Sequence, residues 1–231
     1  MTDSPSSVKV AIVTGGGGSL GRATATTLAA RGLTVVAVDR NEEALRELPD
    51  SIVRESADTT NPATAKSLID RIAADVGPPD VLVNTIGAFH LGDALSTTPE
   101  ELQLMVDVNL GAALWLSQAA APHMQRHGSG VIVHVSARPG IEPSAGMAAY
   151  SVSKAALVHL TRILDVELRP HGIRVNAVAP QLLDTPANRG AFPAEVMAHS
   201  LPPQAIAEVI AFLVSDAAAP VSGAVLPAYG A

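Results

Sequence analysis

The stretch VKVAIVTGGGGSLG, residues 8–21, decides the fold of this chain. Its β-branched run Val8–Thr14 predicts a buried strand, and the Ala-, Thr- and Leu-rich run Ser19–Arg31, which stops at Gly32, predicts a helix. The glycines between them let the backbone turn tightly and approach a pyrophosphate, while the helix N-terminus offers free N–H groups and a positive dipole end. The stretch therefore predicts a phosphate-binding turn, and the alternative is a flexible turn without a ligand.

Outward from this turn, strands and helices alternate along the chain. Further strands are expected at Leu33–Val38, Ile52–Glu55, Val81–Asn84, Val131–Ser136, Arg174–Val178 and Ala224–Leu226. Further helices are expected at Asn41–Glu47, from Asn61 to Val76, and at Pro99–Arg126, Ala148–Arg169 and Pro202–Ser215. The alternation predicts an α/β fold, a single-domain Rossmann-like doubly wound parallel sheet with helices on both faces. We expect residues 1–7 to be a flexible leader and residues 8–231 to form one dinucleotide-binding domain that includes the substrate pocket.

Composition limits the partners and the compartment. The 231 residues carry a net charge of −7 without a basic cluster, which argues against a nucleic-acid partner. The absence of cysteine excludes disulfides and thiolate metal sites. The N-terminus lacks an apolar signal region, and the apolar stretch Leu110–Met124 is too short to cross a membrane and is interrupted by Gln118 and His123. We therefore expect a cytoplasmic protein without a membrane partner.

Asp39 stands at the end of the second expected strand, 18 residues after Gly21. A carboxylate at this position accepts hydrogen bonds from two ribose hydroxyls and repels a 2′-phosphate. The glycine run contains no Lys or Arg to offset that repulsion, although the adjacent Arg40 is within reach of a phosphate. We therefore predict that NAD(H) is preferred over NADP(H). The alternative for Asp39 is a solvated turn residue.

Further motifs lie after the other strands, in an order that resembles the short-chain dehydrogenase/reductase family over nearly the whole chain. They are Thr14–Gly21, Asp58 in Ala-Asp-Thr, Asn84-Thr85-Ile86-Gly87, the mid-helix Asn109, Tyr150-Ser151-Val152-Ser153-Lys154, Asn176–Pro180 with Thr185, Phe212–Asp216 and Ser222-Gly223. The resemblance implies that Asp58 contacts the adenine ring and that the segment from Asn176 to Thr185 holds the nicotinamide carboxamide. The cofactor-binding residues expected in all are Thr14, Gly15, Gly18, Ser19, Leu20, Gly21, Asp39, Asp58, Thr59, Asn84, Ile86, Tyr150, Lys154, Pro180, Leu183 and Thr185.

Tyr150 and Lys154 are four residues apart on an expected helix, so their side chains share one face and project into one pocket. A nearby ammonium and a nicotinamide cation favour the phenolate and would lower the pKa of Tyr150. Tyr150 is therefore the predicted acid/base, with Lys154 as its activator and ribose clamp. By resemblance, Asn109 positions a water for proton relay. The alternatives are a packing role for Tyr150 and, for Asn109, the capping of internal backbone groups.

The catalytic serine of the family falls on Ala137 when positions are counted from Gly140, Tyr150 or Asn109. Ser136 is one residue earlier, and a one-residue shift along a strand turns a side chain to the opposite face. Only a local bulge would let Ser136 take over the role. Since the loss of one donor to a developing oxyanion costs about 2.7–4 kcal/mol, we expect activity to be weakened.

Other departures and residues affect the site less. Ser19 replaces the middle glycine of the turn and is a possible helix cap, and Gln181 replaces the glycine after Pro180. The stretch Pro186–Leu201 is short, so either the expected loop covers a substrate incompletely or the substrate is open-ended. Met147 and Phe89 either border the substrate or pack in the core. No metal is expected, because the spacing of His90, His134 and His199 matches no ligand motif.

The leading hypothesis is an NAD(P)-dependent oxidoreductase that interconverts a secondary alcohol and a ketone by hydride transfer. The alternative is a cofactor-binding protein of the same fold with weak or no catalysis, because Ala137 replaces the serine. The predicted partners are a small-molecule carbonyl or alcohol substrate and further copies of the chain. In the family the helix after Leu110 and the helix carrying Tyr150 pair subunits, which implies a homodimer or homotetramer.

Overall fold

The computed structural model describes residues 8–230, and the expected leader of residues 1–7 and Ala231 lie outside these described residues. The strands are β1 (Val10–Thr14), β2 (Thr34–Asp39), β3 (Val53–Ser56), β4 (Pro79–Asn84), β5 (Gly130–Val135), β6 (Ile173–Pro180) and β7 (Val225–Ala228). The helices are α1 (Ser19–Ala30), α2 (Glu42–Leu45), α3 (Pro62–Asp75), α4 (Pro99–Val106), α5 (Ala112–His127), α6 (Ala148–Leu168), α7 (Pro186–Ala191), α8 (Ala194–Met197) and α9 (Pro203–Val214). Most bounds lie within two residues of the expected ones.

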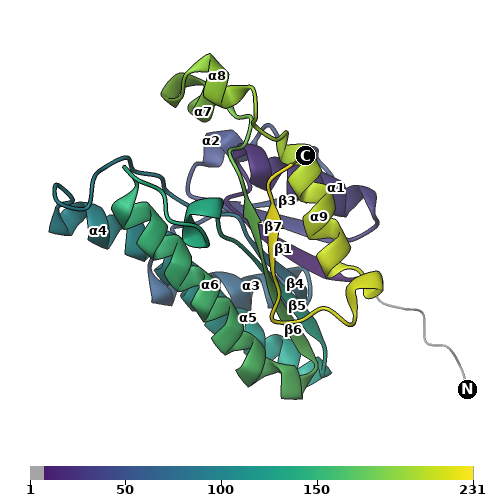
Figure 1. Cartoon of the computed structure of the whole chain (residues 1–231). Coiled ribbons are helices and arrows are strands. Elements are labelled where there is room, and N and C mark those ends of the chain that lie inside the picture. The colour runs from purple at the N-terminus through teal and green to yellow at the C-terminus, as the bar shows by residue number, and fades with distance from the viewer. Residues whose placement is uncertain (1–7, 231) are drawn as a thin grey trace, which may run out of the picture.

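The seven strands form one parallel sheet in the order β3-β2-β1-β4-β5-β6-β7. Helices α1 and α9 cover one face, and α3, α5 and α6 cover the other (Figure 1). The predicted fold class is therefore confirmed. The strand order reverses between β1 and β4, and ligands of such sheets bind at the carboxyl ends of the strands beside this point.

The core consists of two aliphatic layers, one on each face of the sheet. The first includes Val13, Leu28 and Ile210 between the sheet and helices α1 and α9, and the second includes Ile12 and Leu116 between the sheet and helices α3, α5 and α6. Strands that are covered on both faces must be apolar throughout, as the fully buried run of β1 is. This explains how a chain with 3% aromatic residues builds its core from Val, Leu, Ile and Ala.

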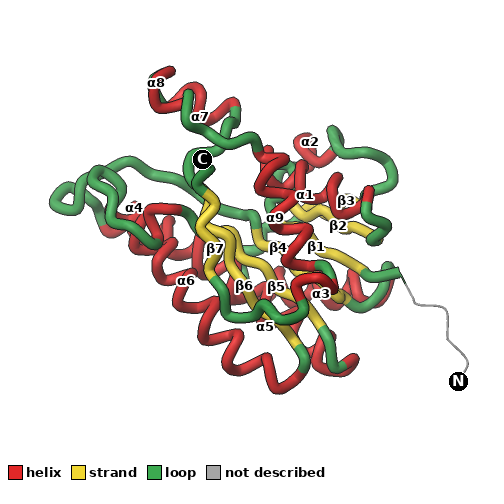
Figure 2. The backbone as a smooth tube through the Cα atoms, turned by 45° about the vertical axis from the view of Figure 1, so that its right-hand side comes forward, coloured by secondary structure: helices red, strands yellow, loops and turns green. Residues whose placement is uncertain are grey.

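Two segments differ from the expectation. The long helix expected at Pro99–Arg126 contains a π-helical turn, Asp107–Gly111, between α4 and α5. The stretch Pro186–Leu201, expected to be a loop, forms α7 and α8, which begin at Pro186 and Ala194. Figures 1 and 2 show these two short helices beyond the carboxyl ends of the strands, near the C-terminus of the chain.

Within the described residues, one continuous helix, Pro99–His127, is long and apolar enough to cross a membrane by length and composition alone. In the structure its α5 part packs against the sheet and α3, where Leu116, Ala120 and Met124 are buried. The buried apolar side chains of this helix therefore pack within the domain.

Candidate active site

The turn after β1 has the geometry that a phosphate-binding loop needs. Gly15 has a φ of +68°, and a Cβ added there would lie 2.9 Å from the backbone nitrogen of Ile86. A Cβ on Gly21 would overlap the carbonyl oxygen of Gly15. These two glycines bring the start of α1 close to the end of β4, which no larger residue at either position permits.

The N-terminus of α1 is open to an anion. Gly18 is the N-cap and makes no side-chain capping hydrogen bond, and the first turn contains no acidic residue. The expected capping by Ser19 is wrong, because Ser19 is itself the first helical residue. The N–H groups of this first turn and the positive end of the helix dipole therefore fit a pyrophosphate. Leu20 lies beside them and lines the neighbouring cavity.

Asp39 ends β2 beside the glycine turn. Its Oδ2 accepts a hydrogen bond from the Gly17 nitrogen at 3.0 Å, and its Oδ1 accepts one from the Asn41 nitrogen at 2.9 Å. Each oxygen keeps a free lone pair, so the carboxylate can still accept from ribose hydroxyls. Asp58 follows β3 on the surface, where hydrogen bonds from Thr60 hold the pKa of its carboxyl below the usual value. Thr59 beside it is buried.

Asn84, at the end of β4, offers an independent sign of a missing partner. Its Oδ1 accepts from the Thr14 hydroxyl at 3.2 Å, while its buried Nδ2 has no hydrogen-bond partner among the described residues. Buried amide donors are nearly always satisfied, so an unpaired one at the strand ends fits a ligand that accepts there. The glycine turn, Asp39 and Asn84 thus together fit a dinucleotide.

Tyr150, Lys154 and Asn109 meet at the carboxyl ends of β4 and β5. Lys154 is buried, donates to the Val135 carbonyl at 2.9 Å, and has its Nζ 6.0 Å from the Tyr150 ring centroid. Asn109 lies in the π-helical turn and bonds both the nitrogen and the carbonyl of Ala88, at 2.8 and 3.0 Å. A Cβ on Gly87 would lie 3.1 Å from Asn109 Oδ1 and 3.2 Å from Lys154 Nζ, so this glycine leaves a gap between the two side chains.

Burial in the protein shifts the pKa values of Tyr150 and Lys154 in opposite directions. Burial raises the pKa of Tyr150 to about 12, and burial lowers the pKa of Lys154 to about 8. The expected lowering of the Tyr150 pKa involves the nicotinamide cation together with the ammonium, and burial by the protein alone acts in the opposite direction. The reason is that desolvation disfavours the phenolate and the ammonium alike, and the Lys154 ammonium is directed at a carbonyl.

Ser136 and Ala137 both follow β5 and line the cavity beside Tyr150, but their surroundings differ. Strands β5 and β6 pair in continuous register from Gly130 to Val135, and Ala137 continues in extended conformation. The Ser136 hydroxyl is buried and donates to the Lys154 carbonyl at 3.0 Å, so it stabilises helix α6. Ala137 lines the cavity with a methyl group that donates no hydrogen bond.

A cavity of about 480 Å³ opens beside Tyr150. Its walls include the aromatic rings of Phe89 and Phe192, with Phe89 edge-on to Tyr150 at 5.0 Å between centroids, together with Met147, Pro180 and Leu183. Of the other expected residues, the Thr185 hydroxyl caps α7 by accepting from the Asn188 nitrogen at 3.1 Å.

Sequence reasoning missed two contributors to this site. Ser153 accepts a hydrogen bond from Asn109 Nδ2 at 3.0 Å and donates to the Tyr150 carbonyl at 2.8 Å, which links the two helices. Its position one residue before Lys154 is a signal that was available. Phe192 carries no such signal, because only the folding of α7 and α8 over the strand ends brings it to the cavity.

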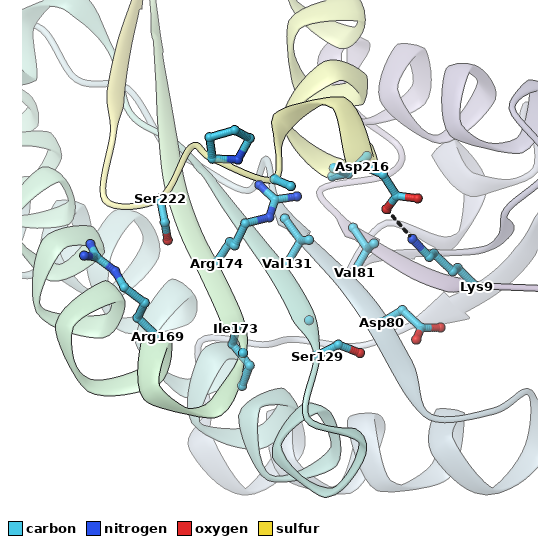
Figure 3. A pocket seen from close by; sticks show the side chains of 15 residues that line it. Lys9, Asp80, Val81, Ser129, Val131, Arg169, Ile173, Arg174, Asp216 and Ser222 are labelled. Atoms are coloured by element: carbon cyan, nitrogen blue, oxygen red, sulfur yellow. Dashed lines mark hydrogen bonds and ion pairs between the residues drawn. The ribbon is translucent and has the colours of Figure 1, made fainter.

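A second cavity of about 510 Å³ lies at the amino ends of the strands, where Gly130 and Ile173 begin β5 and β6 (Figure 3). Its charged side chains all make contacts within the described residues, including Asp80, whose Oδ2 accepts a hydrogen bond from the Val10 nitrogen at 2.7 Å. Lys9 pairs with Asp216 at 2.9 Å, Arg169 with Asp165, and Arg174 donates to the carbonyls of Val221 and Ser215. We therefore take Tyr150 and the carboxyl ends of the strands as the candidate active site.

Comparison with known proteins agrees with this geometry. The family model described as short chain dehydrogenase matches residues 9–196. The chain is 38% identical to cis-4-hydroxycyclohexanecarboxylate dehydrogenase of Sinomonas cyclohexanicum over 96% of this chain and 95% of that protein. It is 32% identical to 4-formylbenzenesulfonate dehydrogenase of Comamonas testosteroni over 96% of both chains.

Solved structures are similar over the same extent. NAD⁺-bound xylitol dehydrogenase is 27% identical with a TM-score of 0.91, covering 96% of this chain and 98% of that chain. The structure of ElxO with NADP bound is 25% identical with a TM-score of 0.88, covering 95% and 96%. Neighbours of this fold thus bind either nicotinamide cofactor.

Proposed function

Since this chain belongs to the short-chain dehydrogenase family, we propose that it is an oxidoreductase that interconverts a secondary alcohol and a ketone with NAD(H). The observation that carries the proposal is the placement of Tyr150 and Lys154 on one face of α6, beside a cavity at the carboxyl ends of the strands. The curated relatives are named dehydrogenases, which supports the same class of reaction.

Tyr150 is the acid in the direction of reduction. The nicotinamide, when bound, supplies the hydride to the carbonyl carbon. The Tyr150 hydroxyl then donates its proton to the carbonyl oxygen, and in oxidation the phenolate takes the proton back. A pKa raised to about 12 keeps Tyr150 protonated as a donor, and the positive charge of the oxidised cofactor favours the phenolate for the reverse step.

Lys154 and Asn109 support this proton transfer. We assign Lys154 to the cofactor ribose hydroxyls, because its ammonium is buried against the Val135 carbonyl at the cavity wall. Asn109 lies across the gap left by Gly87, where a water between its amide and Lys154 completes a relay. The preference for NAD(H) over NADP(H) rests on Asp39, whose carboxylate repels a 2′-phosphate.

The names of two relatives indicate the size of substrate. The compound in each name contains a six-membered ring, with the reacting group at one end and an acidic group, carboxylate or sulfonate, at the other. A cavity of about 480 Å³ with two phenylalanine rings in its wall suits a compound of that size. We therefore place the substrate among compact alcohols and carbonyl compounds.

Ala137 favours a second candidate function, a cofactor-binding protein with weak or no catalysis. Its methyl group leaves the substrate oxygen without one hydrogen-bond donor. This candidate predicts NADH binding without turnover.

We further propose a cytoplasmic homodimer or homotetramer that pairs through the outer faces of helices α5 and α6. Val152 and Val166 on α6 are exposed apolar side chains that such pairing covers. Sedimentation of the full chain gives its oligomeric state.

The test is the binding and oxidation of NADH. Purified protein is titrated with NADH and with NADPH by calorimetry, and NADH oxidation is followed with a panel of ketones and aldehydes. The oxidoreductase proposal predicts turnover that Tyr150→Phe lowers by roughly 10²- to 10⁴-fold, a much larger change than in the affinity for NADH. Binding without turnover by the wild-type chain establishes the second candidate, and absence of binding contradicts both.

A further inference from the structure

Arg138 is held in the wall of the substrate cavity by three neighbours from different segments. Its Nε donates to Glu142 at 2.8 Å, its Nη1 donates to Gln181 Oε1 at 3.3 Å, and its guanidinium carbon lies 4.9 Å from the Tyr229 ring centroid. A guanidinium fixed by an ion pair, an amide and an aromatic face has lost much of its rotamer freedom before any ligand binds.

Several donors of this guanidinium are unused. Arginine has five N–H groups, and the contacts with Glu142 and Gln181 engage one each. The Nη2 group makes no hydrogen bond within residues 8–230, and 44% of the side chain is exposed. The free edge belongs to a residue that lines the cavity, so it is available to a ligand there.

The Arg138 side chain lies toward the β6 and β7 side of the cavity. Gln181 follows β6 and Tyr229 follows β7, so the side chain extends toward that edge of the sheet. Tyr150 packs instead against Phe89, which follows β4 on the other side of β5. We infer that Arg138 is placed to bind a substituent of the substrate that lies away from the Tyr150 hydroxyl.

The rest of the cavity contains few charges. Apart from Arg138 and the buried Lys154, the titratable side chains of the lining are Tyr150 and Glu142. Among the described residues, Glu142 is the only carboxylate of the lining, and 46% of its side chain is exposed. The walls between the two ends are mainly apolar, with Phe89, Phe192 and Met147.

We propose that Arg138 is a specificity-determining residue that binds a carboxylate or sulfonate at the far end of an apolar alcohol or carbonyl substrate. This rests on the proposed oxidoreductase function and names its substrate class. The planar guanidinium fork matches the two oxygens of such a group, and a hydrogen bond to a charged partner contributes more than a neutral one.

The test compares acids with their neutral amides, which have nearly the same shape. Cyclohexanecarboxylate, 4-methylbenzoate and heptanoate are titrated by calorimetry against cyclohexanecarboxamide, 4-methylbenzamide and heptanamide. The wild-type full chain is expected to bind at least one acid about tenfold more tightly than its amide. Arg138→Gln is expected to remove this selectivity and to leave amide binding and NADH binding unchanged.

Two further variants separate charge from shape. Arg138→Lys keeps the charge and loses the fork, so an intermediate selectivity is expected. Glu142→Gln removes the competing carboxylate, so acids bind more tightly while amides are unaffected. If no acid binds more tightly than its amide, or if the selectivity persists in Arg138→Gln, Arg138 is not an anchor for an acidic group of the substrate and the proposal is wrong.

The titrations are made with and without saturating NADH, so that the two proposals fail separately. Failure of NADH to bind contradicts the oxidoreductase function, whereas acid selectivity in the protein without NADH still measures the Arg138 anchor. Equal binding of acids and amides alongside normal NADH binding overturns the anchor alone.

Discussion

The two sides of the candidate active site are built from different parts of the chain. On the β1–β4 side, which we call the backbone side, the groups that face a ligand are mainly backbone groups. They are the close approach of Gly15 to Ile86 and the uncapped N-terminus of α1. On the β5–β7 side, which we call the side-chain side, the cavity is lined by side chains such as those of Ala137, Arg138 and Phe192. A backbone site tolerates little change in its glycines, whereas a side-chain site changes its chemistry with a single substitution.

The largest expected effect is on the side-chain side, at Ala137. Ala137→Ser restores a hydroxyl at the cavity wall, and one donor to a developing oxyanion contributes about 2.7–4 kcal/mol. We expect kcat for carbonyl reduction to rise by roughly 10²- to 10³-fold, with no change in the affinity for NADH. Steady-state kinetics on the best ketone of the panel measure this.

Ser136→Ala is the matched control for that gain, because it changes the adjacent hydroxyl. Ser136 donates to the Lys154 carbonyl, so its loss is expected to lower the free energy of unfolding by about 1 kcal/mol and to leave KM within twofold. If Ser136→Ala abolishes activity and Ala137→Ser has no effect, Ser136 serves the substrate and our account of this strand end is wrong.

On the backbone side, Gly15→Ala is expected to weaken NADH binding about a hundredfold. The substitution forces alanine into a left-handed conformation, which costs about 1–2 kcal/mol, and places its Cβ against Ile86 at the phosphate turn. Gly32→Ala is the matched control, because Gly32 has a φ of +85° with nothing within 4 Å of its added Cβ. Calorimetry should show normal NADH binding by Gly32→Ala, in a protein that melts a few degrees lower.

The buried His134 in β5, the strand that leads to Ala137 on the side-chain side, makes the stability of the protein depend on pH. It is fully buried in β5 with its ring nitrogens 3.2 Å from Ser117 Oγ and 2.9 Å from Thr161 Oγ1, and burial, with the Lys154 ammonium nearby, lowers its pKa to about 3. The unfolded chain protonates this histidine at its ordinary pKa near 6.5, so stability falls as the pH falls below that value. Between pH 7.5 and pH 5 we expect a loss of roughly 2 kcal/mol from this residue.

Urea unfolding at both pH values measures this loss. His134→Asn is expected to reduce the pH dependence by that amount, and His159→Asn, at an exposed position on α6, is expected to leave it unchanged. An equal pH dependence in wild type and His134→Asn assigns the acid sensitivity to other groups.

The backbone side was the more predictable from sequence. The alternation of apolar strands with helices predicts a parallel sheet whose carboxyl ends lie together beside the glycine turn at Gly15. Asp39 ends its strand beside this turn, as its position in the sequence predicts. The spacing of Tyr150 and Lys154 also put both on one helical face, as observed. These features depend on local periodicity and on backbone geometry, which are visible in a short window.

The side-chain side was less predictable because its residues come from distant segments. The π-helical turn that presents Asn109 has no sequence signal of its own. The folding of α7 and α8 over the strand ends brings Phe192 to Phe89, with ring centroids 5.8 Å apart, which a reading of Pro186–Leu201 as a loop missed. The pKa of Tyr150 depends on how deeply the whole fold buries its hydroxyl, and helical spacing does not report that depth.

The smallest expected effect concerns Asp39, the one side chain on which the backbone side relies for selectivity. Asp39→Asn removes the charge that repels a 2′-phosphate, while the amide oxygen can still accept from the Gly17 nitrogen. We expect the ratio of the NADPH and NADH dissociation constants to fall about tenfold, or about 1.4 kcal/mol. Asp75→Asn, an exposed change of the same charge at the end of α3, is the control. An unchanged ratio in Asp39→Asn would mean that Asp39 does not determine the choice between NADH and NADPH. The neighbouring Arg40 would then be the next residue to test.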